Sequence, residues 1–155
     1  MVEIVLPNDA NTLGNVLGGR VLHWIDLAAA IVAHRHCRSE TVTVSLDQMS
    51  FLAPIRVGQL ALIRACMTYV HRTSMEIRVD VWSEDLLTGE RRPTSTAFLT
   101  FVAVDKQGRP APVPPLILET EEERREARAA EARRAARLQA RPAQPPSSPE
   151  ETTHR

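Results

Sequence analysis

The sequence predicts an α+β fold in which an antiparallel sheet curls around one long helix. Three observations lead to this class. Residues 18–36 are apolar on nearly every side of a helix, segments between 41 and 104 show strand-like patterns, and the helix precedes those segments. A helix that is apolar nearly all round must be enclosed by other structure, and alternation with a period of two is typical of strands with one buried face. We therefore expect this helix to form the centre of the core.

Length and composition fit one such domain. The chain has 155 residues, 43% of them hydrophobic, which suffices for one core and leaves little for a second. Basic and acidic residues are equal in number, so there is no overall field for nucleic acid. Two cysteines are too few for a disulfide framework, and no apolar run reaches the length of a membrane span. We expect a cytoplasmic protein without nucleic-acid partners.

The elements are expected in a simple order. A short apolar strand begins near residue 2 and ends at Pro7, and a turn-rich loop then leads to the long helix. Period-two alternation, or apolar residues on both faces, predicts four further strands. These strands are expected at 41–47, 59–71, 74–83 and 94–104.

The region after residue 104 is expected to differ from this domain. The segment 108–115 contains four prolines and should be an extended connector. Thr120 and Glu123 fit a capping box at the start of a second helix. Leu138 is the only large apolar side chain in that helix, so we expect a mainly solvated helix followed by a disordered tail. The predicted division is 1–118 for the folded domain, 119–141 for the charged helix and 142–155 for the tail.

Asp26 is the residue that points most clearly to chemistry. It lies inside the apolar run of the long helix, where an ionised carboxylate is costly unless it has a partner or a chemical task. Small residues on the following turns, Ala29, Ala30 and Ala33, are expected to leave room beside it. A structural acid with a backbone or Asn partner is the alternative.

Gly18 and Gly19 open the same helix. Backbone N–H groups at a helix start are unpaired and partly positive, which suits them to hold a carbonyl oxygen that becomes negative during acyl transfer. A glycine pair can also serve only a tight turn. Gly19 and Asp26 are seven residues apart, a rise of roughly 10 Å along a helix. Since one carbonyl group cannot reach both, we infer that the opposing acid comes from a second subunit related by a two-fold axis.

Other polar residues offer weaker candidates. His23 lies beside Asp26 on the helix, which would also suit dehydratase chemistry, although a packing role is favoured. Asp47 is the second carboxylate candidate, but its place in an alternating strand favours a solvent-facing or hydrogen-bonding role. No spacing of His, Cys or acidic residues predicts a metal site. Arginines in loops or at strand ends that could pair with phosphate are Arg56, Arg72, Arg91 and Arg92.

Taken together, these segments resemble the hotdog-fold acyl-CoA thioesterases, both the cytosolic hydrolases with tandem hotdog domains and their single-domain bacterial relatives. The similarity covers about residues 7 to 125, and the ordered set of motifs is more specific than any one of them. The motifs are Pro7–Gly19, Trp24–Asp26 with Ala28–Ala30, Arg35–Cys37, Val42–Asp47, Phe51–Gly58, Ser74–Val79 and Glu119–Glu123.

The resemblance implies a hotdog domain that hydrolyses fatty acyl-CoA to free acid and CoA without a metal or bound cofactor. In the tandem members, an Asn before the Gly-Gly of one unit works opposite an Asp in the helix of the other, and these map to Asn15 and Asp26. A homodimer would then contain two complete sites, and further assembly into hexamers, as trimers of dimers, is implied. The residues expected to contact CoA are Arg72, Ser74, Arg91 and Arg92.

The expected mechanism places the thioester oxygen at the N–H groups of Gly18 and Gly19, with Asn15 orienting the carbonyl or the water. Asp26 of the partner subunit then activates water or attacks directly to form an anhydride, and the sequence leaves both routes open. Because hotdog domains serve several functions, two alternatives stay open. They are an enoyl-CoA hydratase or dehydratase that uses His23 with Asp26, and a non-catalytic acyl-CoA-binding module.

Overall fold

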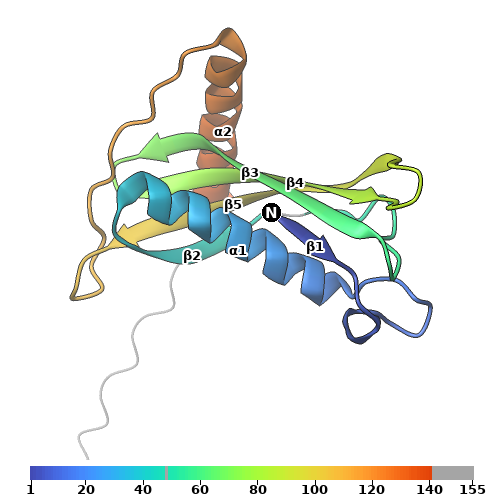
Figure 1. Ribbon diagram of the computed structural model, residues 1–155. Helices are drawn as coiled ribbons and strands as arrows, with labels where there is room; N and C mark the ends of the chain where they lie inside the picture. The colour runs from blue at the N-terminus through green and yellow to red at the C-terminus, as the bar shows by residue number, and fades with distance from the viewer. Residues whose placement is uncertain (48, 141–155) are drawn as a thin grey trace, which may run out of the picture.

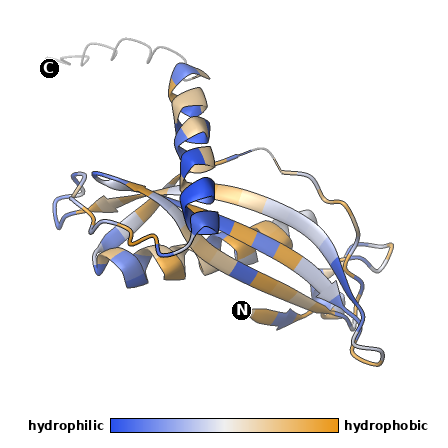
Figure 2. Ribbon diagram, turned by 90° about the horizontal axis from the view of Figure 1, so that it is seen from above, coloured by the Kyte–Doolittle hydropathy of each residue, from blue (hydrophilic) through white to orange (hydrophobic). Residues whose placement is uncertain are grey.

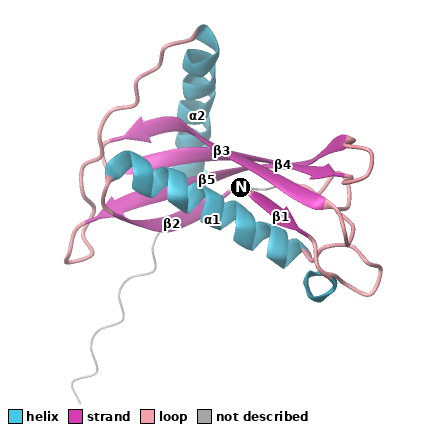
Figure 3. Cartoon of the chain, in the orientation of Figure 1, coloured by secondary structure: helices cyan, strands magenta, loops and turns pink. Residues whose placement is uncertain are grey.

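The computed structural model describes residues 1–47 and 49–140. Five strands form one antiparallel sheet, and helices α1 and α2 lie on its opposite faces (Figures 1 and 3). The sheet has the order β1-β3-β4-β5-β2. The elements are β1 (Val2–Ile4), a single 3₁₀ turn (Pro7–Asp9), α1 (Gly18–Cys37), β2 (Glu40–Leu46), β3 (Leu60–His71), β4 (Ser74–Glu84), β5 (Arg91–Val104) and α2 (Glu121–Ala140). This is the hotdog arrangement that the resemblance implies.

The core lies between α1 and the sheet, as the apolar helix predicted. The strand alternation is confirmed in β4, where every second residue from Met75 to Val81 is buried and belongs to the core cluster. These strand residues pack with the buried face of α1, which consists of Val21, Trp24, Ile25, Ala28, Ala29, Ala33 and Cys37.

Strand β5 begins at Arg91, three residues earlier than predicted. The earlier start includes Pro93, although proline cannot donate a hydrogen bond within a sheet. Here Pro93 pairs with Trp82 next to a register shift, so the irregularity accommodates it.

Strand β2 forms one edge of the sheet, with β5 as its strand partner. Its three apolar side chains, Val42, Val44 and Leu46, are each about half exposed. An apolar strand at an open edge is prone to pair with another chain. The edge formed by β2 is therefore suited to a subunit contact.

Helix α2 crosses the face of the sheet opposite to α1. Its surface is mainly exposed, as predicted, and Figure 2 shows hydrophilic residues over much of its length. The capping box is present, because Glu123 N donates to Thr120 Oγ1 at 3.1 Å and Thr120 N donates to Glu123 Oε2 at 2.9 Å. The predicted disorder of 142–155 lies outside the described residues. No helix of the described ranges is long and apolar enough to cross a membrane.

Candidate active site

Asp9 fixes the loop that leads into α1. Its buried carboxylate forms an ion pair with Arg20 Nε of α1 at 2.7 Å and accepts a hydrogen bond from Leu6 N at 3.2 Å. Its backbone oxygen accepts a further bond from Leu17 N at 2.8 Å. Asp9 thus contacts Leu17, just before α1, and Arg20, in its first turn. These contacts set the position of the first residues of α1.

The start of α1 leaves backbone donors free. Leu17 occupies the N-cap position and provides no side-chain hydrogen bond. The N–H groups of Arg20 and Val21 bond to Leu17 O, whereas those of Gly18 and Gly19 have no partner among the described residues. A cap without a polar side chain costs the helix about 1 kcal/mol relative to Ser or Asp. Two amide donors thus remain available to a ligand oxygen.

Neither glycine of this pair is required by backbone conformation. The glycines with positive φ are Gly14, Gly58, Gly89 and Gly108, a set that does not include Gly18 or Gly19. A Cβ at Gly19 would meet nothing within 4 Å. A tight turn therefore does not account for the pair, and open space lies over Gly19.

Asp26 is exposed in the single chain, so the expectation of a buried carboxylate is wrong for one protomer. The apolar neighbours Trp24 and Ile25 face the sheet, whereas Asp26 and Leu27 face outward. Thr43 Oγ1, on the edge strand β2, donates a hydrogen bond to Asp26 Oδ1 at 2.8 Å. The carboxylate is held in place by this hydroxyl, beside the strand edge that is suited to a subunit contact.

Two of the three alanines that were expected to leave room beside Asp26 are buried instead, whereas Ala30 is only partly buried. Ala29 and Ala33 are fully buried in the core. Asp26 lines neither the cavity at the start of α1 nor the groove beside α2. A substrate space at Asp26 that a second protomer completes stays a prediction.

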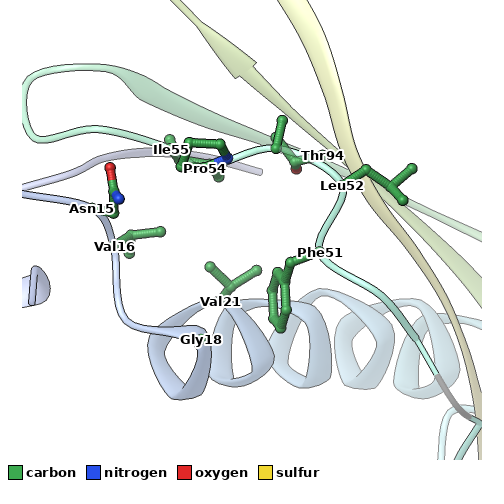
Figure 4. Close-up of a pocket in the computed structure, with 10 residues that line it drawn as sticks. Asn15, Val16, Gly18, Val21, Phe51, Leu52, Pro54, Ile55 and Thr94 are labelled. Carbon is green, nitrogen blue, oxygen red and sulfur yellow. The ribbon is translucent and has the colours of Figure 1, made fainter. Parts of the chain in front are cut away.

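A cavity of about 320 Å³ opens at the N-terminal end of α1 (Figure 4). It brings together two of the predicted site residues, Asn15 and Gly18. The remaining lining residues are Val16, Val21, Phe51, Leu52, Ala53, Pro54, Ile55 and Thr94. Since Asp26 lies two turns further along α1, a rise of roughly 10 Å from the glycine pair, one chain does not assemble all the predicted catalytic groups.

Asn11 is a polar residue that sequence reasoning passed over in favour of Asn15. Its side-chain oxygen accepts hydrogen bonds from Leu13 N at 3.0 Å and Asn15 N at 3.2 Å. Asn11 thus shapes the loop that carries Asn15. The signal that could have indicated it is its position in the same Pro7–Gly19 motif.

The weaker candidates fall in different places. His23 is exposed and has no hydrogen bond to Asp26 among the described residues. Asp47 pairs with Arg137 at 2.9 Å, the kind of role that its strand pattern favoured. Within the described part of the chain, no group of His, Cys, Asp and Glu could hold a metal ion. A reaction without a metal or cofactor stays a prediction.

The residues predicted to contact CoA divide into two groups at opposite ends of β4. Arg72 and Ser74 lie at the β3–β4 hairpin, where Arg72 has a φ of 36°. Arg91 and Arg92 begin β5 beyond the other hairpin, where they pair with Glu84 and Glu90. With a strand of 11 residues between them, the groups are separated by roughly 35 Å. One protomer therefore does not bring them together.

Arg56 lies closer to the predicted catalytic groups. Its backbone forms an isolated β-bridge with that of Asn15, which lines the cavity. This bridge places a cationic residue beside the loop that carries Asn15.

A helix with free N-terminal amides, packed across a curved antiparallel sheet, defines this protein as a hotdog-fold domain with a candidate acyl-transfer site. The sequence pattern of the thioesterase superfamily matches residues 13–90, and the chain belongs to that superfamily. This match, together with the relatives described next, confirms the predicted resemblance to the hotdog-fold acyl-CoA thioesterases.

Curated relatives agree with this assignment. The chain is 47% identical over 119 residues to the uncharacterized acyl-CoA thioester hydrolase YkhA of Bacillus subtilis, covering 77% of this chain and 69% of that protein. It is 37% identical over 127 residues to the cytosolic acyl coenzyme A thioester hydrolase of Rattus norvegicus. That match covers 81% of this chain but only 33% of the rat protein, so the chain spans about a third of its length.

Solved structures share the whole fold. An apo-hexameric acyl-CoA thioesterase has 45% identity and a TM-score of 0.86, with 90% of this chain and 89% of that chain covered. An acyl-CoA hydrolase from Staphylococcus aureus, solved with butyryl coenzyme A and coenzyme A, has 32% identity and a TM-score of 0.80. The match covers 90% of this chain and 87% of that chain.

Three alanine variants of the Staphylococcus aureus hydrolase have also been solved. They replace an asparagine, an aspartate 15 positions later and a threonine a further 17 positions on. The same residue types occur at the same spacing here, as Asn11, Asp26 and Thr43. This correspondence draws attention to the two residues that sequence reasoning missed, Asn11 and Thr43.

Proposed function

We propose that this protein hydrolyses fatty acyl-CoA to free fatty acid and CoA, at a site completed between two copies of the chain. The observation that carries the proposal is the hydrogen bond of 2.8 Å from Thr43 to Asp26. It orients an exposed carboxylate at the edge of the domain, where another protomer can approach. The hydrolase names of the relatives and the matching spacing of Asn11, Asp26 and Thr43 support the same reaction.

The reaction divides between the start of α1 in one protomer and Asp26, two turns further along the same helix, in its partner. The N–H groups of Gly18 and Gly19 donate hydrogen bonds to the thioester oxygen as it becomes negative, and Asn15 orients the carbonyl or the water. Asp26 of the partner subunit either removes a proton from the water that attacks the carbonyl carbon, or attacks that carbon itself to form an anhydride that water then hydrolyses. In both routes the C–S bond breaks and CoA leaves as its thiolate, which takes up a proton. Thr43 acts as a positioning residue, because its hydroxyl restricts the orientation of the Asp26 carboxylate.

A thiol-release assay with acyl-CoA substrates tests this assignment. Asp26→Asn keeps the shape of the side chain and should lower kcat by about 10² to 10⁴-fold, the usual contribution of a general base. Thr43→Val should lower kcat by roughly 10-fold or more, since a hydrogen bond to a charged group is lost. Thr43→Ser should restore it. The matched control is Asp85→Asn, in an exposed turn, which should leave turnover unchanged. Normal turnover by Asp26→Asn would remove Asp26 from the mechanism.

Mixed dimers test whether the site is shared. Asp26→Asn and Asn15→Ala chains carrying different tags are expressed together, and the doubly tagged species is isolated. If the groups come from different protomers, this species has one intact site and recovers activity that neither parent variant has. If both groups come from the same chain, every site is damaged and no activity returns. Hydration of an enoyl-CoA in place of thiol release would instead favour the dehydratase alternative.

A further inference from the structure

We propose that the cavity at the start of α1 receives the acyl tail of the substrate, and that the Phe51 ring determines which chain lengths fit. The inference rests on the proposed thioesterase function and extends it to substrate selection. Phe51 is assigned here as a specificity residue, separate from the groups that carry out hydrolysis.

The chemistry of the cavity suits a hydrocarbon. None of its ten lining residues carries a charged side chain. Val21, Ile55 and Thr94, which line it, are buried in the protein. The Thr94 hydroxyl already donates to Val81 O at 2.9 Å, so it does not call for a polar ligand. An apolar tail would gain from burial here, whereas the phosphates of CoA would meet no charged side chain among the lining residues.

The position of the cavity fits the proposed reaction. Gly18, one of the two proposed oxyanion donors, is also a lining residue, as is Asn15. A thioester whose oxygen lies at the Gly18 N–H therefore has its carbonyl carbon at the edge of the cavity. The acyl chain, attached to that carbon, can enter the cavity while the sulfur and the CoA portion remain outside.

Phe51 is placed at this point by the loop that carries it. Leu52 N donates to Thr94 O at 2.8 Å, and further along the loop Ile55 O accepts from Val16 N, also at 2.8 Å. The Phe51 ring lies beside the first turns of α1 in Figure 4, and its Cε2 is 3.5 Å from where a Cβ would lie on Gly18. Half of the residue is exposed, so the ring is not a core residue. It forms a side wall of the cavity next to the proposed oxyanion donors.

The size of the space predicts a restriction on chain length. At about 320 Å³, the cavity lies at the lower end of the roughly 300–1,000 Å³ typical of ligand pockets. Replacing the ring by a methyl group enlarges the space, and a larger ring reduces it. The groove beside α2 is larger, about 800 Å³, but it is lined by charged side chains that include Glu76 and Arg137, so it is a poorer host for a hydrocarbon.

The test measures kcat/KM of the full-length protein for acyl-CoAs of graded length, from acetyl to palmitoyl. Phe51→Ala should raise the ratio of kcat/KM for palmitoyl-CoA to that for butyryl-CoA by about 10-fold or more, and Phe51→Trp should lower it. The matched control is Leu87→Ala, which removes an almost fully exposed apolar side chain and should leave the ratio unchanged.

The outcomes separate this inference from the proposed function. If the wild-type protein hydrolyses acyl-CoA but all variants keep its length profile, the inference is overturned while the proposed function stands. A KM that rises equally for every chain length in Phe51→Ala would place the pantetheine arm in the cavity, and it would also overturn the inference. Absence of thiol release by the wild-type protein, with every acyl-CoA, would overturn both.

Discussion

The two helices contact opposite faces of one sheet, and they do so by different means. Both contain twenty residues. Helix α1 buries seven side chains, all of them apolar, against the sheet. Helix α2 fully buries only Ala130, and its other contacts with the sheet include ion pairs made by Arg133 and Arg137. The hydrophobic effect holds α1, whereas specific charge contacts orient α2.

The contact under α2 centres on Glu76 of β4. Its carboxylate is only 2% exposed and accepts hydrogen bonds from Thr68 Oγ1 at 2.9 Å, Arg133 Nη2 at 2.8 Å and Arg137 Nη1 at 3.1 Å. The Arg133 guanidinium also lies 3.8 Å from the ring centroid of Phe98. Because desolvating a carboxylate is costly, such a cluster adds little net stability but is strongly disrupted when one partner is removed. It determines where α2 lies more than how stable the domain is.

The largest expected effect comes from removing the charge of Glu76, which should release α2 but not α1 from the sheet. Glu76→Gln keeps the size of the side chain but weakens its bonds to Arg133 and Arg137. We expect α2 to lose about 2 kcal/mol of docking free energy, which is roughly 30-fold faster amide exchange in α2, while α1 stays protected. Hydrogen exchange followed by mass spectrometry measures both helices in one experiment.

Glu122→Gln is the matched control for this variant. Glu122 is exposed on α2, its contact with Arg125 is 4.0 Å long, and exchange should not change when it is replaced. Equal loss of protection in α1 and α2 after Glu76→Gln would show that the cluster supports the whole domain.

The starts of the two helices also differ, since α2 is capped by Thr120 and α1 has Leu17 at the corresponding position. Leu17→Ser gives α1 a side-chain acceptor. It should raise the free energy of unfolding by about 1 kcal/mol. It should also lower kcat, by roughly 10-fold, because an amide donor needed by the substrate becomes occupied. Urea unfolding and thiol release measure the two effects.

Leu86→Ser is a suitable control, because Leu86 lies in a turn and is 53% exposed, close to the 47% of Leu17. The control should neither raise the free energy of unfolding nor lower kcat. A Leu17→Ser protein that is more stable and fully active would show that the free amides of α1 have no part in turnover.

Much of the fold could be predicted because its signals are local. The apolar run of α1 and the alternation of β4 follow directly from periodicity, and α1 differs from the prediction by one residue at its end. The ion pairs of α2 could not be predicted. Glu76 and Arg133 are 57 positions apart, and an arginine on a charged helix gives no local sign of its partner.

The site shows the same division. The free donors of Gly18 and Gly19 follow from their place at a helix start, which the sequence indicated. The outward orientation of Asp26 depends on which side of α1 meets the sheet, and its contact with Thr43 joins a helix to a strand 17 positions away. The path of the loop around Phe51 depends on its bond to Thr94 O and leaves no motif. Contacts between elements, rather than the elements themselves, escaped prediction.

The smallest expected effect concerns acid and the cap of α2. Hydrogen bonds from the backbone N–H groups of Thr120 and Glu119 lower the pKa of Glu123 below its ordinary value of 4.5. Because the pKa is lowered on folding, the ionised Glu123 stabilises the helix fully at a pH above that ordinary value. The stabilisation is lost as the pH falls through the pKa of the folded state. NMR shifts of the Glu119 and Thr120 amides should therefore titrate with an apparent pKa below 4.5.

The start of α1 provides the internal comparison for this titration. It has no acidic residue in its first turn, so the Gly18 and Gly19 amides should not follow the Glu123 curve. Glu123→Gln should remove the titration at Thr120 and leave the glycine amides as they were. If instead the Gly18 amide titrated together with that of Thr120 and stopped doing so in Glu123→Gln, the two helix starts would be coupled through the sheet. The contrast between a start closed by its own side chains and one left open for a ligand would then fail.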